Sequence, residues 1–277
     1  MEFFNEIRHV RAVYWSATGN SRKVAETIAN ALGEAFGLSP ETCDFTLPQA
    51  RINDLTCSAG ELVVFVTPTY AGKLPNKMLP YIKEQIHGNG AFAVPCVTFG
   101  NRSYDNALAE LCDTLTDNGF YTVAAGAFVG RHAFSDELGF GRPDTADKWE
   151  MERFAKRIAE KLKKLTDFPA PVVVPGDSAA PYYVPKGTDG QPAKFLKAKP
   201  QTDLKKCNNC GACARICPMG AIDPQNPSNV PGTCIKCQRC VRRCTRRAKY
   251  FDDPAFLSHI TMLEQNFTDF KENDVFF

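Results

Sequence analysis

The N-terminal part of the chain, residues 1–165, alternates short apolar runs with longer segments in which apolar residues recur at helical spacing. The near-continuous apolar run over 61–66 is typical of a strand buried on both faces of a parallel sheet. Residues 21–36 instead place Val24, Ile28 and Leu32 on one helical face. We expect strands over 10–15, 61–66, 91–99 and 122–129, and helices over 21–36, 75–86, 104–118 and 144–165. This alternation predicts an α/β fold with a doubly wound parallel sheet.

The pattern changes after residue 166. Residues 167–206 contain seven prolines, which indicates an extended connector, stiffer than a Gly/Ser tether, with 182–184 packed on a domain surface. A cysteine-rich segment follows, and then apolar residues recur at the spacing of a last helix. A length of 277 residues favours two domains. We divide the chain into a sheet domain (1–166), a connector (167–200), a cysteine-rich domain (201–252) and a C-terminal helix and tail (253–277).

Eight of the twelve cysteines lie between Cys207 and Cys244. They form two runs of the pattern C-x2-C-x2-C-x3-C. Every cysteine of the first run has a counterpart in the second run at one constant offset (234 − 207 = 244 − 217). This regularity indicates an internal duplication. Disulfide bonds would suit a small secreted protein, but the chain begins without a basic region followed by an apolar stretch, so we expect a cytoplasmic protein. Zinc is the alternative, although zinc sites usually pair two C-x2-C motifs across a gap.

Each run resembles the cluster-binding run of bacterial two-cluster ferredoxins, in which the fourth cysteine of each run binds the other run's cluster. Pro218 matches this pattern, whereas Thr245 stands where proline is usual and is expected to alter the local turn or one cluster's potential. The resemblance implies a small α+β ferredoxin domain with two [4Fe-4S] clusters. One cluster would be bound by Cys207, Cys210, Cys213 and Cys244, and the other by Cys217, Cys234, Cys237 and Cys240.

A loop rich in hydroxyl groups follows the first expected strand and precedes the first helix. Its residues are Ser16, Ala17, Thr18, Gly19, Asn20 and Ser21. Unpaired N–H groups and the positive end of the helix dipole make this position suitable for a phosphate group. The loop has no lysine, so it is not the loop that binds nucleoside triphosphates, and it lacks the G-x-G-x-x-G dinucleotide pattern. A plain serine or threonine helix cap is the alternative.

The hydroxyl-rich loop resembles the phosphate loop of flavodoxins, S/T-x-S/T-G-x-S/T, at every specified position. The loops after the next two expected strands occupy the places where flavodoxins hold the two sides of the flavin ring, and Tyr70 is a candidate stacking partner. The resemblance implies FMN as cofactor and the strand order 2-1-3-4-5. Beyond the phosphate loop, the implied FMN-binding residues are Pro68, Thr69, Tyr70, Ala71, Gly72, Phe99, Gly100, Asn101, Tyr104 and Asp105. The chain as a whole is similar to iron–sulfur flavoproteins that join a flavodoxin-like domain to a two-cluster ferredoxin domain.

One histidine and four isolated cysteines can each be interpreted as structural or as functional residues. His132 follows the last expected strand at the edge where the flavin would lie. It is a candidate proton donor because the pKa of histidine is near neutrality, and a hydrogen-bonded loop histidine is the alternative. We interpret the four isolated cysteines as buried small hydrophobic residues; they are Cys43, Cys57, Cys96 and Cys112.

Charge is unevenly distributed along the chain. Residues 186–250 contain 14 Lys and Arg against 3 Asp and Glu, a net of +11, whereas 1–185 (18 against 22) and 251–277 (1 against 6) are acidic. Two clusters with their thiolates supply about −4. The excess around Arg239–Lys249 predicts docking of an acidic electron donor or acceptor, such as a ferredoxin, a flavodoxin or a reductase.

The predicted function is intramolecular electron transfer between two [4Fe-4S] clusters and bound FMN, in a redox carrier or reductase module for a partner protein. One alternative is a terminal flavin-dependent reductase of a small organic substrate, and the sequence leaves open whether the protein is an enzyme. A basic iron–sulfur protein that binds nucleic acid is the other, but the aromatic platform of single-strand binders is missing, so we expect no nucleic acid. No apolar run has the length of a membrane span. Oxygen-sensitive clusters favour an anaerobic setting.

Overall fold

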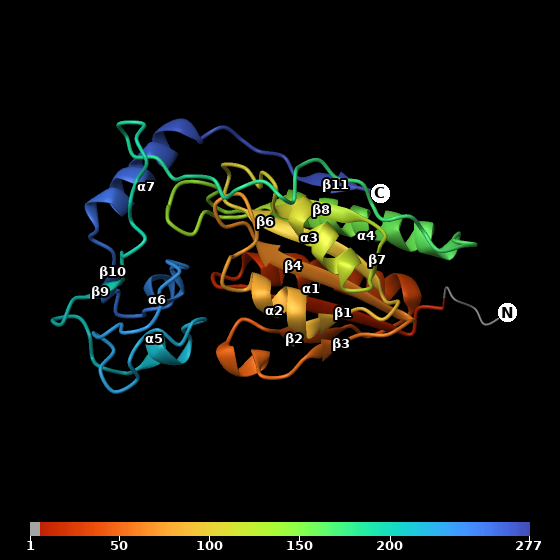
Figure 1. Ribbon diagram of the computed structural model, residues 1–277, viewed down its shortest axis with the longest axis horizontal. Helices are drawn as coiled ribbons and strands as arrows, with labels where there is room; N and C mark the ends of the chain where they lie inside the picture. The colour runs from red at the N-terminus through yellow and green to blue at the C-terminus, as the bar shows by residue number, and fades with distance from the viewer. Residues whose placement is uncertain (1–5) are drawn as a thin grey trace.

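The computed structural model describes residues 6–277 and is built around one seven-stranded sheet (Figure 1). Five parallel strands form most of it, in the spatial order β2-β1-β4-β6-β8. Their bounds are His9–Tyr14 (β1), Glu41–Asp44 (β2), Glu61–Pro68 (β4), Phe92–Phe99 (β6) and Ala125–Val129 (β8). The predicted fold class is confirmed, and the order is the 2-1-3-4-5 that the resemblance implied.

Short strands complete the sheet and depart from the prediction. The strand expected over 122–129 is divided into β7 (Tyr121–Thr122), which pairs with β6, and β8. The C-terminal β11 (Asp274–Phe276) pairs antiparallel with β8 and forms one edge. At the other edge β2 gave no sequence signal because three of its four residues are exposed. A second small pair consists of β3 (Leu55–Thr56) and β5 (Ile86–His87), and a 3-10 helix, η1, spans Pro48–Arg51.

Helices cover both faces of the sheet. On one face lie α1 (Asn20–Phe36) and α4 (Thr145–Lys163), and on the other α2 (Leu79–Gln85) and α3 (Ala107–Asp117). Successive residues of β4 alternate between the two cores, so that Val64 packs toward α1 and Phe65 toward α2 and α3. Both sides of the central strands are therefore buried, as the near-continuous apolar run over 61–66 predicted for β4.

The cysteine-rich segment forms a small α+β unit beyond the carboxyl ends of the parallel strands (Figure 1). Its strands β9 (Gln201–Thr202) and β10 (Lys249–Tyr250) pair antiparallel, and its helices are α5 (Ala212–Arg215) and α6 (Arg239–Arg242). The duplication in the sequence is also a duplication of structure, because α6 follows α5 at the same offset as the second cysteine run follows the first (239 − 212 = 234 − 207). Left-handed backbone recurs at this offset, at Asn209, Gly211 and Gly220 and again at Lys236, Gln238 and Arg247.

The turn after the fourth cysteine is the same in both copies. The N–H of Gly220 donates to the carbonyl oxygen of Cys217 at 3.0 Å, and that of Arg247 donates to Cys244 at 2.9 Å. We expected Thr245, which stands in the place of a proline, to alter the local turn or one cluster's potential. The turn is not altered. The turn tolerates the change because its closing hydrogen bond comes from the N–H of Gly220 or Arg247 and not from the position that proline would occupy.

The connector is a strap along the sheet domain and not a free spacer. Residues 164–200 contain no helix or strand. The backbone of this segment bonds to the sheet domain along its course, from Val172 to Thr122 at 2.9 Å and from Tyr183 to Ala71 at 2.8 Å. After the cysteine-rich unit, α7 (Pro254–Asn266) packs on the connector through Phe195 and Phe256. Within residues 6–277 no helix combines the length and the apolar character needed to cross a lipid bilayer.

Candidate functional site

A cavity of about 480 Å³ lies at the carboxyl ends of β1, β4 and β6. Ligand sites in proteins occupy roughly 300–1,000 Å³. Residues from all three loops that the sequence singled out line it: Ser16, Ala17, Thr18, Asn20, Ser21, Pro68, Thr69, Tyr70, Ala71, Gly72, Phe99 and Gly100. The fold thus brings together three segments that lie far apart in the sequence.

The hydroxyl-rich loop forms one end of this cavity, at the start of α1. Gly19 is the N-cap residue, with φ of 109°, and has no side chain to cap the helix, so a serine outside the N-cap position serves one N–H of the first turn. The Ser16 hydroxyl accepts a hydrogen bond from the Arg22 N–H at 3.1 Å, and that of Ser21 pairs with Thr98 at 2.9 Å. The first N–H groups of a helix lack partners within it, so this end of the cavity suits an anion.

Other walls of the cavity suit a flat aromatic ring with a polar chain. The Tyr70 ring lies edge-on to the buried Trp15, with ring centres 5.8 Å apart and planes at 82°. Among the described residues, the Thr69 hydroxyl and Nε of Arg131 are buried without a hydrogen-bond partner. Both residues line the cavity, and a bound ligand with polar atoms would satisfy them. Anion-binding loop, aromatic wall and unpartnered polar atoms together fit FMN.

Four residues expected to bind FMN lie outside the cavity wall, namely Gly19, Asn101, Tyr104 and Asp105. Gly19 shapes the loop, and Asp105 forms an ion pair with Arg102. The Asn101 amide donates to the carbonyl oxygens of Phe267 and Asp269, at 2.6 and 2.9 Å. The Tyr104 hydroxyl donates to Asp274 at 2.9 Å. The side chains of Asn101 and Tyr104 are therefore already hydrogen-bonded to the C-terminal tail. The sequence patterns did not place the tail at this site.

The connector and α7 contribute walls to the cavity; the packing of 182–184 on the sheet domain was predicted and is confirmed, but its place in the cavity wall was not predicted. The lining residues added by these two segments include Tyr182, Tyr183, Pro185, Phe195, Leu196, His259 and Leu263. The Tyr182 hydroxyl donates to the carbonyl oxygen of Leu74 at 2.9 Å, and the Arg102 guanidinium stacks 4.2 Å from the centre of the Tyr183 ring. The pair of tyrosines in a proline-rich segment was the available signal. These contacts cover an edge of the sheet that would otherwise be open.

A buried ion pair anchors this strap. The ammonium group of Lys73 lies 3.0 Å from the Glu110 carboxylate, and both side chains are only 7% exposed. Lys73 also donates to the carbonyl oxygens of Ser178 and Ala180, at 2.5 and 2.9 Å. Because a buried charge needs its partners, the connector is held in place over the loop that follows β4.

His132 lies in the cavity wall, but its protonation differs from the expectation. Burial, followed by the nearby His259 and Arg242, lowers the pKa of His132 to about 4. Its Nδ1 accepts a hydrogen bond from the backbone N–H of Phe134 at 3.1 Å, so the neutral ring carries its proton on Nε2. Near pH 7 this histidine is a hydrogen-bond donor and not an acid, and the alternative of a hydrogen-bonded loop histidine describes it.

A second, smaller cavity is lined by four cysteines, Cys217, Cys234, Cys237 and Cys240. The last cysteine of the first run thus meets three from the second run. Burial, and then the charges on Cys237, Cys234 and Cys217, raises the pKa of the Cys240 thiol. Burial raises the pKa of the Cys237 thiol to about 12. Thiolates in such apolar surroundings require a positive partner, which iron supplies.

The other four predicted cluster ligands include the most exposed of the cluster cysteines, whereas the first four include the most buried one, Cys237. Cys207, Cys213 and Cys244 are half-buried and Cys210 is exposed. Backbone N–H groups reach sulfur in both copies, since Ala221 donates to Cys217 and Ala248 to Cys244, each at 3.3 Å. Such bonds tune the potential of a bound cluster, and the two copies supply them in the same way.

The four isolated cysteines have no place in either cavity. Cys57, Cys96 and Cys112 are buried, as predicted, while Cys43 on the edge strand β2 is half-buried. Burial raises the pKa of the Cys57 thiol to about 11 and that of Cys112 to about 12. These thiols are therefore protonated and unreactive at neutral pH.

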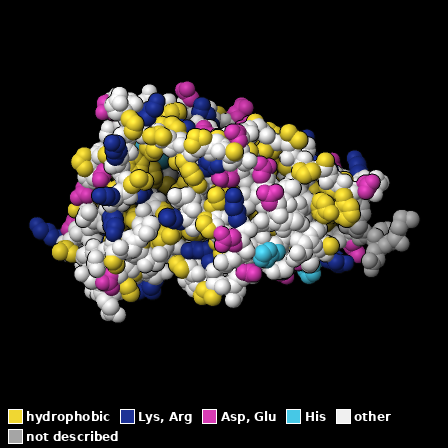
Figure 2. Space-filling model, in the orientation of Figure 1, with side chains coloured by type: hydrophobic (Ala, Val, Ile, Leu, Met, Phe, Trp, Pro, Cys, Tyr) yellow, Lys and Arg dark blue, Asp and Glu magenta, His cyan; other side chains and the backbone are white. Residues whose placement is uncertain are grey.

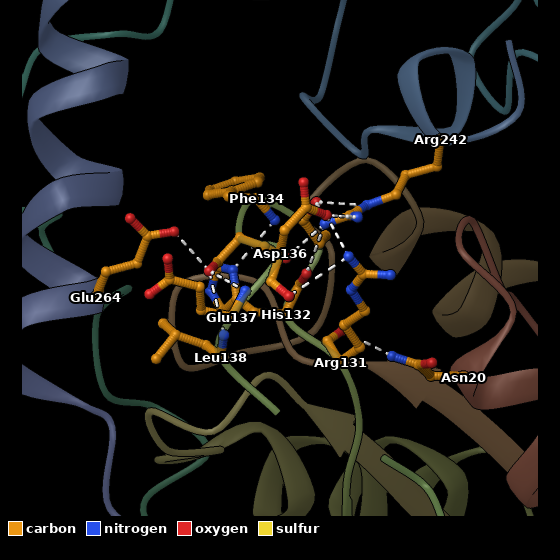
Figure 3. Close-up of polar contacts among 11 residues, drawn as sticks. Asn20, Arg131, His132, Phe134, Asp136, Glu137, Leu138, Arg242 and Glu264 are labelled. Carbon is orange, nitrogen blue, oxygen red and sulfur yellow. Dashed lines mark hydrogen bonds and ion pairs between the residues drawn. The ribbon is translucent and has the colours of Figure 1, made fainter. Parts of the chain in front are cut away.

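Arg242 of α6 joins the cysteine-rich unit to the loop after β8 (Figure 3). Its guanidinium donates to the carbonyl oxygens of Ala133 and Ser135, at 3.0 and 2.6 Å, and pairs with the Asp136 carboxylate. The Ser135 hydroxyl in turn donates to Glu264 of α7 at 2.6 Å. One loop thus fastens the sheet domain to both of the segments that follow it.

Two more basic residues of the expected docking face are also used internally. Arg239 donates to the carbonyl oxygens of Ser16 and Ala17, at 2.8 and 3.1 Å. Lys249 is 4% exposed and donates to the Thr202 hydroxyl at 2.7 Å. The prediction of a free basic face is wrong for Arg239, Arg242 and Lys249, because folding places them against the chain's own carbonyl and hydroxyl oxygens. Arg243, Arg246 and Arg247 are exposed.

The two cavities share a wall. Ile235 and Lys236, which lie between two cluster cysteines in the sequence, line both. On the larger cavity's side stands Tyr70, whose pKa is raised by burial and then by the charges on Cys237 and Cys234. This short stretch of chain therefore lies between the four-cysteine cavity and the one that fits FMN.

Comparisons with known proteins agree with this division. Residues 13–146 match the family model of flavodoxin, and residues 200–223 match that of the 4Fe-4S binding domain, which favours iron–sulfur over zinc at the cysteines. The chain therefore contains a flavodoxin-like domain fused to a ferredoxin-type iron–sulfur domain, a combination that serves electron transfer with a flavin and iron–sulfur centres. A search among curated proteins gave no match.

Solved structures resemble the sheet domain. A flavodoxin from the domain Archaea is 17% identical, with a TM-score of 0.42, over 56% of this chain and 99% of its own. Flavodoxin 2 from Bacillus cereus is 17% identical, with a TM-score of 0.38, over 55% and 99%. Rubredoxin oxygen:oxidoreductase from the anaerobe Desulfovibrio gigas is 17% identical, with a TM-score of 0.36, over 57% and 37%. The fold assignment rests on the family models and on the strand order of the sheet.

Proposed function

We propose that this protein transfers electrons between two [4Fe-4S] clusters and one bound FMN, as a redox carrier or reductase module for a partner protein. Bound FMN exchanges electrons singly with a cluster and in pairs with a substrate. The chain's own contribution is to hold these centres close together, to exclude water between them and to set their potentials through charge and hydrogen bonds. The second cluster is supported by the structural duplication, since α6 repeats α5 and its left-handed positions at the same offset as the cysteines.

The observation that carries the proposal is the shared wall of Ile235 and Lys236. A ferredoxin unit merely tethered to a flavodoxin domain would not need to line the flavin cavity. Here the cysteine run itself does so, and Cys237 is buried in the same apolar cluster as the core of the sheet domain. The cluster bound by Cys217, Cys234, Cys237 and Cys240 is therefore the one next to the flavin.

The other cluster is the point of exchange with a partner protein in this proposal. Cys210 is exposed, and so are Lys205, Lys206, Arg215, Arg246 and Arg247 in the same unit. Figure 2 shows Lys and Arg side chains spread over the end of the molecule that holds this unit. An acidic donor or acceptor would be attracted to that end by charge complementarity. Electrons would then pass through the outer cluster, the inner cluster and the flavin in that order, or in reverse.

The covered flavin cavity favours one second candidate, a terminal reductase of a small organic molecule. Tyr182, Phe195 and Leu196 of the connector stand where a protein partner would otherwise approach the flavin. A small molecule that entered beside these side chains would meet the neutral His132, which can orient an oxygen or nitrogen atom through Nε2.

Anaerobic purification followed by a stepwise reductive titration tests the proposal. Iron, sulfide and flavin are measured first, and optical and EPR spectra are then recorded at each step. We expect about eight iron and eight sulfide ions and one FMN per chain, as two [4Fe-4S] clusters require, with cluster and flavin signals that change in linked steps. Iron without bound flavin, or about four irons per chain, would contradict it. Reduction of a small organic molecule without any acceptor protein would favour the second candidate.

A further inference from the structure

Two arginines of the iron–sulfur unit contact the hydroxyl-rich loop at the phosphate end of the cavity, from outside the cavity wall. Arg239 lies between two cluster cysteines and donates to the carbonyl oxygens of Ser16 and Ala17, at 2.8 and 3.1 Å. Arg243 follows one helical turn later. Its Nη2 lies 3.9 Å from the place where a β-carbon on Gly19 would stand, directly over the loop. Both side chains therefore come from a segment that the flavodoxin domain itself does not contain.

The charges of these two arginines have no acidic partner. Among residues 6–277 neither forms an ion pair, and Nε of Arg239 is buried without any hydrogen-bond partner. Other arginines nearby are paired, since Arg22 of α1 bonds to Glu26 at 2.8 Å and Arg242 pairs with Asp136. The hydroxyl-rich loop has no lysine or arginine of its own. Two cations without an Asp or Glu partner thus stand beside a loop whose geometry suits an anion.

We infer that α6 of the iron–sulfur unit completes the phosphate site of the flavin cavity. Arg239 is a positioning residue that fixes the shape of the loop through Ser16 and Ala17, and Arg243, beside Gly19 on the outer side of the loop, supplies positive charge to the phosphate end of the cavity. This inference rests on the proposed binding of FMN. It adds that the site selects the phosphorylated flavin by charge, and that the selecting residue belongs to the ferredoxin-type unit.

A consequence is that flavin binding and the inner cluster are energetically linked. Arg239 is flanked by Cys237 and Cys240, so the ligation of those cysteines also holds the arginines of α6 in place. If the cluster raises the affinity for FMN, then FMN must stabilise the cluster by the same factor, because coupling between two binding events is reciprocal. Riboflavin, which lacks the phosphate, should show much less of this coupling.

Flavin affinity of the cluster-loaded protein tests the role of Arg243. Dissociation constants of FMN and riboflavin are measured by flavin fluorescence, at low and high salt, for the wild type, Arg243→Gln and the control Arg246→Gln. Arg246 is exposed, and its replacement removes the same charge from the same segment. Loss of a hydrogen bond between charged groups should weaken FMN about 10- to 100-fold in Arg243→Gln and leave riboflavin within about twofold. The advantage of FMN over riboflavin should also fall at high salt.

The outcomes separate this inference from the proposed function. If the wild type binds neither flavin, the proposed function fails. If it binds FMN and riboflavin equally well, or if Arg243→Gln and Arg246→Gln behave alike, only the inference fails. The coupling is measured on the wild-type protein, as the rate at which an iron chelator removes iron. We expect saturating FMN to slow the loss of about half of the iron, that of one of two clusters, and riboflavin to slow it less. Equal rates with either flavin would overturn the coupling.

Discussion

Replacing Arg242 by Gln should loosen the attachment of the iron–sulfur unit to the flavodoxin domain and slow electron transfer between them. The side chain is 22% exposed and makes two kinds of contact with the loop after β8. One is to the carbonyl oxygens of Ala133 and Ser135, at 3.0 and 2.6 Å, and the other is to the carboxylate of Asp136, which is 79% exposed. The two contacts contribute very differently to the free energy of attachment.

The carbonyl contacts account for most of the stabilisation. A hydrogen bond to a charged group contributes about 1.5–3 kcal/mol, so two of them contribute about 3 kcal/mol even at the lower limit. An ion pair with an exposed carboxylate contributes at most about 1 kcal/mol. Arg242→Gln should therefore lower the ratio of attached to detached units about a hundredfold. Asp136→Asn, which leaves the carbonyl contacts in place, should lower it by less than about tenfold.

Two measurements check this prediction. Hydrogen exchange of the amides over 132–138 should become about a hundredfold faster in Arg242→Gln and change little in Asp136→Asn. After rapid reduction of the clusters, the flavin should be reduced more slowly in Arg242→Gln, because electron transfer falls steeply with the distance between centres. An Arg242→Gln protein with unchanged exchange and an unchanged rate of flavin reduction would refute the argument that this loop holds the two units together.

Three further predictions concern the cluster, the buried histidine and the strap. Cys217→Ser should lose about half of the iron. The EPR signal that disappears should be that of the cluster coupled to the flavin, although Cys217 belongs to the first cysteine run. Loss of the outer cluster's signal instead would contradict the assignment. Burial lowers the pKa of His132 to about 4, so the unfolded state takes up a proton at higher pH than the folded state does. The free energy of unfolding should fall between about pH 6.5 and pH 4, and denaturant titrations should show a smaller fall in His132→Asn; equal falls would remove His132 as the cause. Lys73→Met leaves Glu110 buried without its partner and should cost about 3–5 kcal/mol, with faster proteolysis of residues 178–200; a strap that stays resistant would show that other contacts suffice.

Local patterns predicted the centre of the molecule. The apolar runs of β4 and β6 are long enough to require burial on both faces, and the cysteine spacing of each run is reproduced as one helical turn with the same left-handed positions. The phosphate loop was recognisable because its hydroxyl groups and glycine lie together in the sequence. In each of these cases the residues that determine the structure are close neighbours along the chain.

Contacts between distant segments were not predictable in the same way. Asn101 and Tyr104 follow β6 as flavin-binding residues would, yet they bond to the C-terminal tail. Arg242 belongs to a basic segment that resembles a docking surface, and only the packing of two domains shows that its charge is used internally. A hydrogen bond of this kind depends on three-dimensional position, which neither periodicity nor spacing encodes.

The two halves of the iron–sulfur unit have the same backbone conformation but different surface side chains. The difference matches where each half lies relative to the sheet domain. At the offset that relates the two copies, Arg239 and Arg243 correspond to Ala212 and Ile216. The arginines face the phosphate loop of the sheet domain. Arg215, which corresponds to Arg242, merely donates to the carbonyl oxygen of Cys210 in its own copy. A duplication that served cluster binding alone would not need this asymmetry. Arginines stand where the second copy meets the flavodoxin domain, so the same helical turn that holds the inner cluster also shapes the flavin site.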